Sequence, residues 1–481
     1  MIFNTPELFG TPKHKIMDTV HGAIPMFSHE RKIIDHPLFL RLRHIKQNDI
    51  LQFVFIGASH TRFEHSIGTM HIASRIFKTM MRNLIRYKGI NTLTQNQIEG
   101  IQYIYGCLRL AALLHDVGHF PFSHQFEESE FGKKVFTDTS LIEALWKNPN
   151  NYLNNGKPSS LKHEHFSLLC GIEILKELDS QHNSIFETED ILGIMEKGDI
   201  MPSEKFCSHS LTLLKLFIGQ LTWKEGSNKA MELKIQGFLK DIISGEIDAD
   251  KMDYLLRDSF FSGAKYGEYN LDHLINNMWL GWEIKTSVDA AWVGVAIDEK
   301  GKGAFEDFVH SRFRMYLHVY NHKTVVNFKW LVRQAILEIS GSKEIETSYS
   351  NLKEGIISLL DLSDTLFWEL FREHSKNHVH SACYYIINRK KLKYLSSLRI
   401  DKSPAFEIEN KKSDIEKKYN CNVIEAEAPS KFSKIHSGYE KLRLLTFDKI
   451  TKRPSLSSIH SDFFEGTKDI MIRHYFEDPQ F

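Results

Sequence analysis

The sequence predicts a mostly α-helical protein, in which a helical core precedes a smaller α+β lobe at the C-terminal end. Through most of residues 63–340, apolar residues recur at three- and four-residue steps, the spacing of helices that bury one face. After about Gly341, charged segments alternate with short β-prone runs such as "CNVIEA" and "LRLLTF", as in a small mixed lobe. We therefore expect a core over residues 1–340 and a lobe over residues 341–481.

Two helices are expected at the centre of the core. The first follows Phe63, where an apolar stripe recurs at helical spacing for about six turns. The second is "IEGIQYIYGCLRLAALLHD", which ends at Asp116 and is apolar nearly all round, as in a helix buried on every side.

A surface insertion is expected over residues 128–162, where Asn, Gly, Pro and Ser punctuate the chain, as in "WKNPNNYLNNGKPSS". It would serve as a lid, a subunit contact or an inert loop. Helical spacing then returns in "HEHFSLLCGIEILKEL" and continues to residue 263. The segment "SVDAAWVGVAID" predicts a hairpin, and residues 302–339 predict a long amphipathic helical stretch.

Composition argues against several classes of protein. The 61 Lys and Arg residues balance the 61 Asp and Glu residues, so the overall charge does not indicate nucleic-acid binding. No run approaches the roughly 18–20 apolar residues of a membrane span, and the N-terminus lacks the pattern of a signal peptide. The five cysteines show no CxxC spacing, which favours reduced thiols. We expect a cytoplasmic protein without membrane contact.

Histidines and aspartates in separate segments suggest a metal site. "RFEHSIG" supplies His65, "LLHDVGH" supplies His115 and Asp116, and "IDADKMDYLLRD" supplies Asp250. Two imidazoles and two carboxylates suit a divalent ion such as Mn, Fe, Ni or Zn, or Mg where oxygen ligands dominate. A buried Asp116 without a partner would cost on the order of 1–3 kcal/mol, which favours the metal over simple core packing.

The order H…HD…D resembles the HD superfamily of metal-dependent phosphohydrolases. Five segments, "DTVHGAIPM", "DHPLFLRLRHIKQ", "GASHTRFEHSIG", "HDVGHFPFSH" and "DADKMDYLLRD", resemble its deoxynucleoside-triphosphate triphosphohydrolase branch. That branch includes the sterile-alpha-motif/HD-domain enzymes of animals and their bacterial relatives. The resemblance extends from about Lys13 to Ile336 and is weak beyond. We expect no sterile-alpha-motif domain before the HD region.

The resemblance implies a role for each matching residue. The metal ligands would be His65, His115, Asp116 and Asp250. His119 and His124 would face the scissile phosphate, Glu127 would orient His124, and His163 would be a further catalytic histidine, with His165 as a competing assignment. Residues at substrate-contacting positions are Gln47, Arg62, Lys251, Tyr254, Asp258 and Arg312. Three of these have structural alternatives: Arg62 and Arg312 would pair with carboxylates, and Tyr254 would pack in the core.

The implied reaction is hydrolysis of a deoxynucleoside triphosphate (dNTP), with dGTP favoured, to the deoxynucleoside and inorganic triphosphate. A metal-activated water, with Mn or Mg favoured, would attack the α-phosphorus, and His124 would protonate the leaving oxygen. The resemblance also implies a homo-oligomer, with a tetramer favoured, and a nucleotide activator bound at Asp35 and Arg43. Those two residues would otherwise form an internal salt bridge.

The sequence departs from the family pattern at two positions, and two alternative functions stay open. Leu40 stands where an amide would help to read the activator's base, and Asn48 stands where an apolar residue is common. An HD-type phosphodiesterase or phosphatase acting on another nucleotide would use the same metal ligands. A nucleotide sensor or nucleic-acid-binding protein with weak activity is the third hypothesis.

Overall fold

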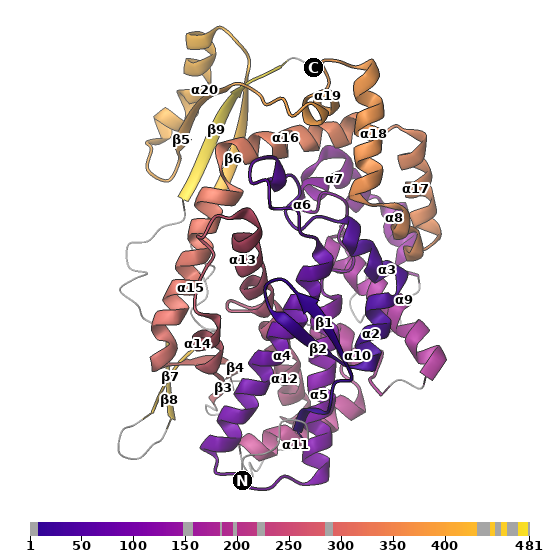
Figure 1. The fold of residues 1–481 in the computed structure, drawn as a ribbon, viewed down its shortest axis with the longest axis vertical. Coiled ribbons are helices and arrows are strands. Elements are labelled where there is room, and N and C mark those ends of the chain that lie inside the picture. The colour runs from indigo at the N-terminus through magenta and orange to yellow at the C-terminus, as the bar shows by residue number, and fades with distance from the viewer. Residues whose placement is uncertain are drawn as a thin grey trace.

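The computed structural model describes residues 8–147, 157–182, 185–195, 200–218, 227–283, 292–430, 443–447, 454–458 and 470–479. Over these residues the protein is mostly helical and carries three small sheets, which confirms the predicted fold class (Figure 1). No helix in these ranges is long and apolar enough to cross a membrane.

A β-hairpin that the sequence patterns did not predict opens the fold. Strands β1 (His14–Asp18) and β2 (Gly22–Met26) pair antiparallel. One carboxylate oxygen of Asp18 accepts hydrogen bonds from the backbone N–H groups of Val20 and His21, and the other accepts from Arg257 at 2.8 Å. The hairpin turn is thereby held against the helix that carries Arg257. After the hairpin come α2 (Ser28–Asp35), α3 (Pro37–Leu40), and the 3-10 turns η1 (Arg41–His44) and η2 (Leu51–Phe53).

Helices α4 (Arg62–Tyr87) and α5 (Gln95–Leu114) pack against each other at the centre of the protein. Each begins with a capping box that satisfies free backbone N–H groups of its first turn. Every residue of α5 from Tyr103 to Leu114 is buried, which confirms the predicted central helix. Because α5 ends at Leu114, His115 and Asp116 follow directly on a rigid, fully packed helix.

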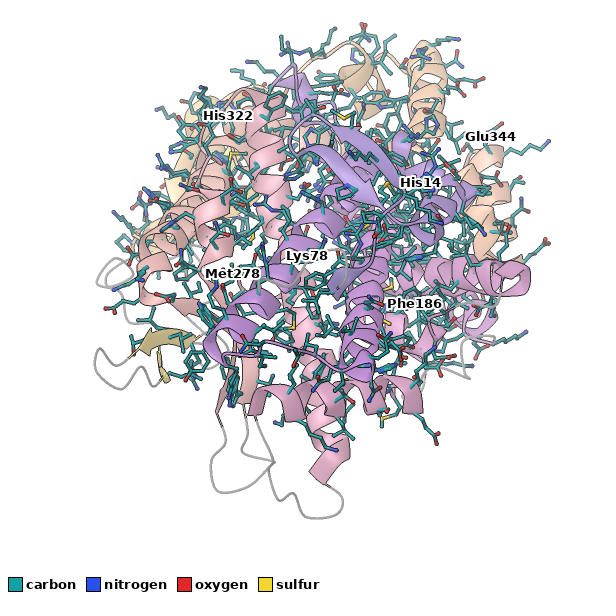
Figure 2. The ribbon with its side chains drawn as sticks, turned by 60° about the horizontal axis from the view of Figure 1, so that its bottom comes forward. His14, Lys78, Phe186, Met278, His322 and Glu344 are labelled. Atoms are coloured by element: carbon teal, nitrogen blue, oxygen red, sulfur yellow. The ribbon has the colours of Figure 1, made fainter. Side chains whose placement is uncertain are left out.

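The remaining elements of the first 340 residues surround this pair. They are α6 (His124–Glu128), α7 (Glu130–Thr137), α8 (Thr139–Leu145), α9 (His163–His182), α10 (Thr188–Met195), α11 (Glu204–Ile218), α12 (Ser227–Ser244), α13 (Ala249–Ser262), α14 (Leu271–Asn276), β3 (Met278–Glu283), β4 (Trp292–Asp298), η4 (Glu299–Gly301), α15 (Lys302–Met315), the π-helical turn η5 (Tyr316–Tyr320) and α16 (Lys323–Glu338). Figure 2 shows Lys78 of α4 close to Met278 of β3, where Asn83 of α4 donates a hydrogen bond to the Met278 carbonyl at 3.1 Å.

The structure differs from the expected surface insertion over residues 128–162. Its first part forms α7 and α8, whose apolar residues Val135, Phe136, Leu141 and Ile142 are buried in the main core. The turn-forming residues that suggested an insertion are concentrated later, and residues 148–156 lie outside the described ranges. The short apolar stripes of α7 and α8 were the signal for burial.

The C-terminal part continues the main core before it forms a sheet. It contains α17 (Lys343–Glu354), η6 (Ile356–Asp361), α18 (Asp364–Asn377), α19 (Ala382–Ile387), β5 (Tyr394–Arg399), α20 (Ala405–Tyr419), β6 (Val423–Ser430), β7 (Arg443–Phe447), β8 (Pro454–Ser458) and β9 (Ile470–Glu477). Buried residues of α17, α18 and α19 belong to the same core as α4 and α5, so packing shows no break near Gly341. A small separate cluster lies between α20 and the antiparallel sheet β5-β9-β6.

The other sheet joins the two parts of the chain. Strands β3 and β4 pair antiparallel, and β7 adds to β4 in parallel, with β8 at the far edge. The predicted strands in "SVDAAWVGVAID", "CNVIEA" and "LRLLTF" correspond to β4, β6 and β7. The hairpin expected within "SVDAAWVGVAID" is formed instead by β3 and β4, so that segment supplies only the second strand; residues 284–291 lie outside the described ranges.

Candidate metal and phosphate site

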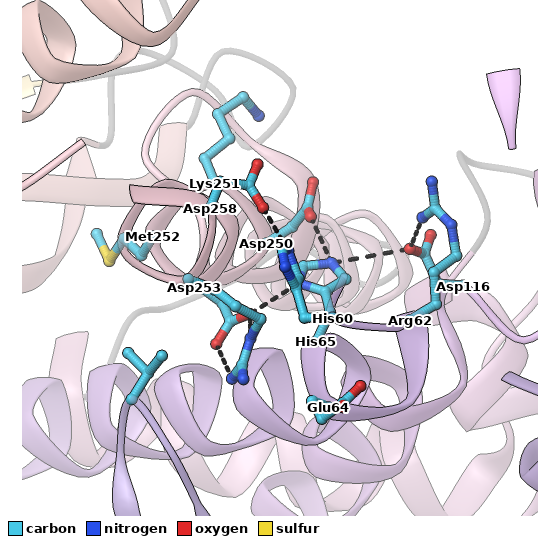
Figure 3. A network of polar contacts seen from close by, with 12 residues as sticks. His60, Arg62, Glu64, His65, Asp116, Asp250, Lys251, Met252, Asp253 and Asp258 are labelled. Carbon is cyan, nitrogen blue, oxygen red and sulfur yellow. Dashed lines mark hydrogen bonds and ion pairs between the residues drawn. The ribbon is translucent and has the colours of Figure 1, made fainter. Parts of the chain in front are cut away.

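The four predicted metal ligands lie where α4, α13 and the end of α5 meet, and Figure 3 shows three of them, His65, Asp116 and Asp250. The Nε2 atom of His65 lies 3.0 Å from Asp250 and 3.7 Å from Asp116. The Nε2 atom of His115 lies 3.5 Å from Asp116 and 3.9 Å from Asp250. Ligand atoms around an ion with bonds of 2.0–2.2 Å lie about 2.9–3.6 Å apart, so the four residues surround a space that fits a divalent cation.

The hydrogen bonds of the two histidines leave the correct nitrogens available. The Nδ1 atom of His65 bonds the Asp253 carboxylate and that of His115 bonds the Ala112 carbonyl, each at 2.8 Å. An Nδ1–H that donates leaves the lone pair on Nε2, the arrangement of metal-binding histidines. Both Nε2 atoms are buried and make no hydrogen bond of acceptable geometry within the structure. The donor set and these two unsatisfied atoms fit a metal ion.

In this cluster, burial and the neighbouring charges shift the pKa values in opposite directions. Burial lowers the pKa of His65, but the Asp250 and Asp253 carboxylates outweigh burial and raise it to about 10. Burial raises the pKa of Asp116, but the charges of His115 and Arg62 hold it well below its usual range. The carboxylates are therefore ionised at neutral pH, and the site holds positive charge between them.

Asp253 braces the site, although no role had been predicted for it. Besides His65, it accepts hydrogen bonds from His21 at 2.6 Å and from Arg257 at 2.8 and 2.9 Å. Helix α4 passes so close that a Cβ on Gly68 would lie 1.9 Å from an Asp253 oxygen. The sequence signal was the spacing of Asp250, Asp253 and Arg257 at i, i+3 and i+7 on one face of α13.

The predicted catalytic histidines gather around Glu127, on the other side of Asp116. One Glu127 oxygen lies 2.7 Å from Nδ1 of His163, and the other lies 3.3 Å from Nδ1 of His124. The rings of His119 and His163 stack with their centroids 4.0 Å apart. Burial raises the pKa of Glu127, but its bonds to the two histidines lower it well below the usual range. Glu127 thus holds His163 as well as His124.

The structure also separates the two histidines of "KHEH". His163 meets Glu127, whereas His165 bonds the backbone N–H of Lys162 at 2.9 Å and packs edge-on against Trp146. Only His163 therefore lies at the histidine cluster.

A strained loop presents His124. Phe122 and Ser123 have φ angles of +54° and +49°, a region that non-glycine residues rarely adopt. Asp364, at the start of α18, accepts the Phe122 N–H at 2.8 Å. Arg41 donates to the carbonyl of His119 at 2.6 Å. These two contacts offset the backbone strain, so the turn after α5 is fixed from behind by elements distant in the sequence.

The predicted phosphate-binding cations are engaged with carboxylates or tyrosines. Arg62 pairs with Asp116 and donates to Ser123 at 2.9 Å. Lys251 pairs with Asp248, which caps the N-terminus of α13. Arg312 bonds Tyr254 and lies over the Tyr316 ring, 4.9 Å from its centroid. Arg62 therefore does pair with a carboxylate, as the structural alternative for this residue predicted.

Asp258 and Gln47, both predicted to contact the sugar, differ in their bonding. Asp258 is held on both oxygens, by His60 at 2.7 Å and by Tyr320 at 2.5 Å. Tyr320 ends the π-helical turn η5, a distortion frequent at functional sites. The side-chain oxygen of Gln47 and the side-chain nitrogen of Asn48 are buried and unsatisfied.

Comparison with known proteins identifies the fold around this site. Residues 62–147, which include His65, His115 and Asp116, match the HD domain family. This stretch of the chain is similar to an HD domain. Human deoxynucleoside triphosphate triphosphohydrolase SAMHD1 is 28% identical over 364 residues, covering 74% of the chain and 50% of the human protein. An uncharacterized protein of Methanocaldococcus jannaschii is 27% identical over 376 residues, covering 78% of the chain and 61% of that protein.

The chain therefore spans about half to three fifths of the length of these two relatives. A solved phosphohydrolase from Bacteroides thetaiotaomicron shares the fold, with a TM-score of 0.60, 19% identity and coverage of 97% of this chain and 99% of that one. The family resemblance drawn from the motifs is confirmed.

The two residues predicted to bind an activator, Asp35 and Arg43, form no salt bridge with each other. Exposed Asp35 pairs with Arg31 one turn earlier at 2.7 Å. The exposed Arg43 lies over the Phe63 ring, 3.6 Å from its centroid. The expected alternative, a salt bridge between Asp35 and Arg43, is wrong.

Sequence patterns also missed Asp49, which lies beside the histidine cluster. It is buried and has a φ of +42°. Burial raises its pKa, which the charges of Lys329, His124 and Arg62 partly offset. Its proximity to Gln47 in "IKQND" was the one available signal.

Proposed function

We propose that this chain is a metal-dependent hydrolase that cleaves a dNTP into the deoxynucleoside and inorganic triphosphate. The observation that carries the proposal is the grouping of His65, His115 and Asp116, with Asp250 close to both histidines and both Nε2 atoms unsatisfied. Beside it, Glu127 bonds both His124 and His163. The similar SAMHD1 proteins are named as deoxynucleoside triphosphate triphosphohydrolases, which supports a dNTP as the substrate. Among dNTPs, we propose dGTP as the preferred substrate.

His65, His115, Asp116 and Asp250 would hold one divalent cation, with Mn²⁺ or Mg²⁺ as first candidates. A bound divalent ion lowers the pKa of a water and polarises a phosphate oxygen. Because the Asp250 and Asp253 carboxylates raise the pKa of His65, an ion at this site would displace a proton from its Nε2 on binding.

His124 would donate the proton to the 5′-oxygen that leaves when water attacks the α-phosphorus. Its Nδ1 is directed to Glu127, which leaves Nε2 for the substrate, and 56% of its side chain is exposed. His119 and His163 stack behind it and would complete the wall that faces the phosphate. A positioned imidazole typically contributes 10²–10⁴-fold to the rate.

Arg62, Lys251 and Arg312 would neutralise the triphosphate. Arginine offers a planar fork to phosphate and lysine a compact charge. Because Lys251 is paired with Asp248, phosphate must compete with that carboxylate. On the sugar side, Gln47 and Asp258 would contact the deoxyribose, and Tyr254 would crowd the 2′ position.

We also propose that nucleotides regulate the enzyme and that it assembles as a homo-oligomer, with a tetramer first. Asp35 and Arg43 are both exposed. Asp35 pairs with Arg31 and Arg43 lies over Phe63, so an activator that binds both residues would not have to break a salt bridge between them. Size-exclusion chromatography with light scattering, with and without GTP, tests both proposals.

Product analysis tests the proposed reaction. The purified protein is incubated with each of the four dNTPs and Mn²⁺ or Mg²⁺, and the products are separated by ion exchange. Inorganic triphosphate with the deoxynucleoside supports the proposal, whereas phosphate or pyrophosphate favours an HD phosphatase acting elsewhere on the nucleotide. His163→Ala should lose activity, and His165→Ala, whose histidine packs on Trp146, is the matched control.

A further inference from the structure

Three helices of the C-terminal part bring together a second group of metal-ligating side chains. Glu338 ends α16, His374 lies in the last turn of α18, and Cys383 lies in the first turn of α19. One ligand atom from each lies within 4.8 Å of the other two. Among the described residues, this is the one such group that includes no residue of the proposed active site.

The geometry of the group is open enough for an ion. The distance between His374 Nε2 and a Glu338 oxygen is 3.9 Å, too long for a hydrogen bond. Tetrahedral zinc, with bonds of 2.0–2.3 Å, separates its ligand atoms by about 3.3–3.6 Å. Movements of roughly an ångström in the side chains would therefore bring the three atoms to bonding distance.

Each side chain is fixed yet retains a free electron pair. The two Glu338 oxygens accept the backbone N–H groups of Ala382 and Cys383 at 2.7 and 2.9 Å, and each keeps a second lone pair. The His374 ring stacks on His378, with centroids 4.1 Å apart. The Cys383 thiol lies 3.7 Å from the Ala335 carbonyl and also interacts with the Glu338 carboxylate.

Binding of an ion must remove a proton from sulfur. Burial and Glu338 raise the pKa of the Cys383 thiol, so the ion has to displace that proton into solvent. A quarter of the His374 side chain is exposed, which leaves a route for the ion and room for a water.

We propose that Glu338, His374 and Cys383 form a second metal site, specific for Zn²⁺ or another thiophilic divalent ion, with water as the fourth ligand. Thiolate, imidazole and carboxylate together select zinc over the Mn²⁺ or Mg²⁺ proposed for the HD site. The ion joins α16, α18 and α19, and α18 begins at Asp364, which holds the loop of His124. The site is independent of the proposed hydrolase activity.

Cobalt substitution tests the site with a signal that the HD site does not give. Metal-free protein carrying His115→Ala, which removes a proposed ligand of the HD site, is titrated with Co²⁺ and followed by absorbance. A thiolate bound to Co²⁺ gives a charge-transfer band in the near ultraviolet, and the HD cluster contains no cysteine. We expect a band that saturates at one equivalent and is displaced by Zn²⁺.

Variants assign the band to its ligands. Cys383→Ser should abolish it, whereas Cys421→Ser, which changes a half-buried cysteine of the small C-terminal cluster, should retain it. If Cys383→Ser fails to fold, His374→Ala decides, because its side chain is partly exposed and its loss should still reduce the affinity for Co²⁺ at least tenfold. Absence of the band, its persistence in Cys383→Ser, or unchanged affinity in folded His374→Ala overturns the proposal.

Discussion

Replacing Asp253 by Asn should weaken both the fold and the proposed metal site. Asp253 is fully buried and accepts hydrogen bonds from His21, His65 and Arg257, two of them from the guanidinium. Asn keeps the shape and one oxygen, but its NH₂ group faces donors instead of accepting from them. Removing one partner of a buried ion pair costs about 3–5 kcal/mol, and retention of one oxygen places this variant near the lower limit.

The effect on metal binding follows from the same contact. Asp253 fixes the His65 ring with its proton on Nδ1, and loss of such a partner typically weakens metal affinity 10–100-fold. Titration of Mn²⁺ by calorimetry measures this effect, and urea unfolding in the presence of a chelator measures the loss of stability separately.

Asp272→Asn is the matched control. Asp272 pairs with Arg75 at the surface, where 76% of its side chain is exposed, so the change should cost less than about 1 kcal/mol and leave Mn²⁺ binding unchanged. Folded Asp253→Asn protein that binds Mn²⁺ as tightly as the wild type would refute the idea that Asp253 orients His65.

Three further outcomes are expected. His124→Ala should lower the hydrolysis rate by about 10²–10⁴-fold with Mn²⁺ affinity unchanged; a matching loss of Mn²⁺ would show that His124 is a ligand instead. Gly68→Ala should unfold at lower urea concentration than the wild type, because the added Cβ would meet Asp253; equal midpoints would contradict this packing. The lowered pKa of Glu127 adds stability above about pH 4.5, and the raised pKa of His163 adds stability below about pH 6.5. In a double-mutant cycle on Glu127 and His163, measured in the presence of a chelator, the coupling free energy should therefore be largest between these two pH values. A coupling free energy that does not change with pH would contradict this interpretation.

Part of the candidate site was predictable because its residues come in short local groups that match family motifs. His115 and Asp116 directly follow an apolar helix, and helical spacing puts Asp250 and Asp258 on one face of another. The expected surface insertion was wrong for residues 130–146, because turn-forming residues outweighed two short apolar stripes that tertiary packing buries.

The bracing residues escaped prediction because their contacts span the chain. His21 reaches Asp253 across 232 positions, and His60 reaches Asp258 across 198. Each looks like an isolated polar residue in the sequence, and only packing of β1, β2 and α4 against α13 brings the partners together. No periodicity encodes such pairs, which is also why the Cys383 group is visible only in the structure.

The pairing of the proposed phosphate-binding cations with carboxylates has a consequence for the proposed catalysis. Arg62 is held by Asp116 and Ser123, and Lys251 by Asp248, before any substrate arrives. Long cationic side chains lose about 2 kcal/mol of rotamer entropy when they are fixed, and here that loss occurs during folding. A triphosphate would then meet charges already in place, which is the condition for electrostatic stabilisation of the transition state. The same carboxylates reduce the net positive charge, so substrate affinity should depend on a cation at the HD site to restore it.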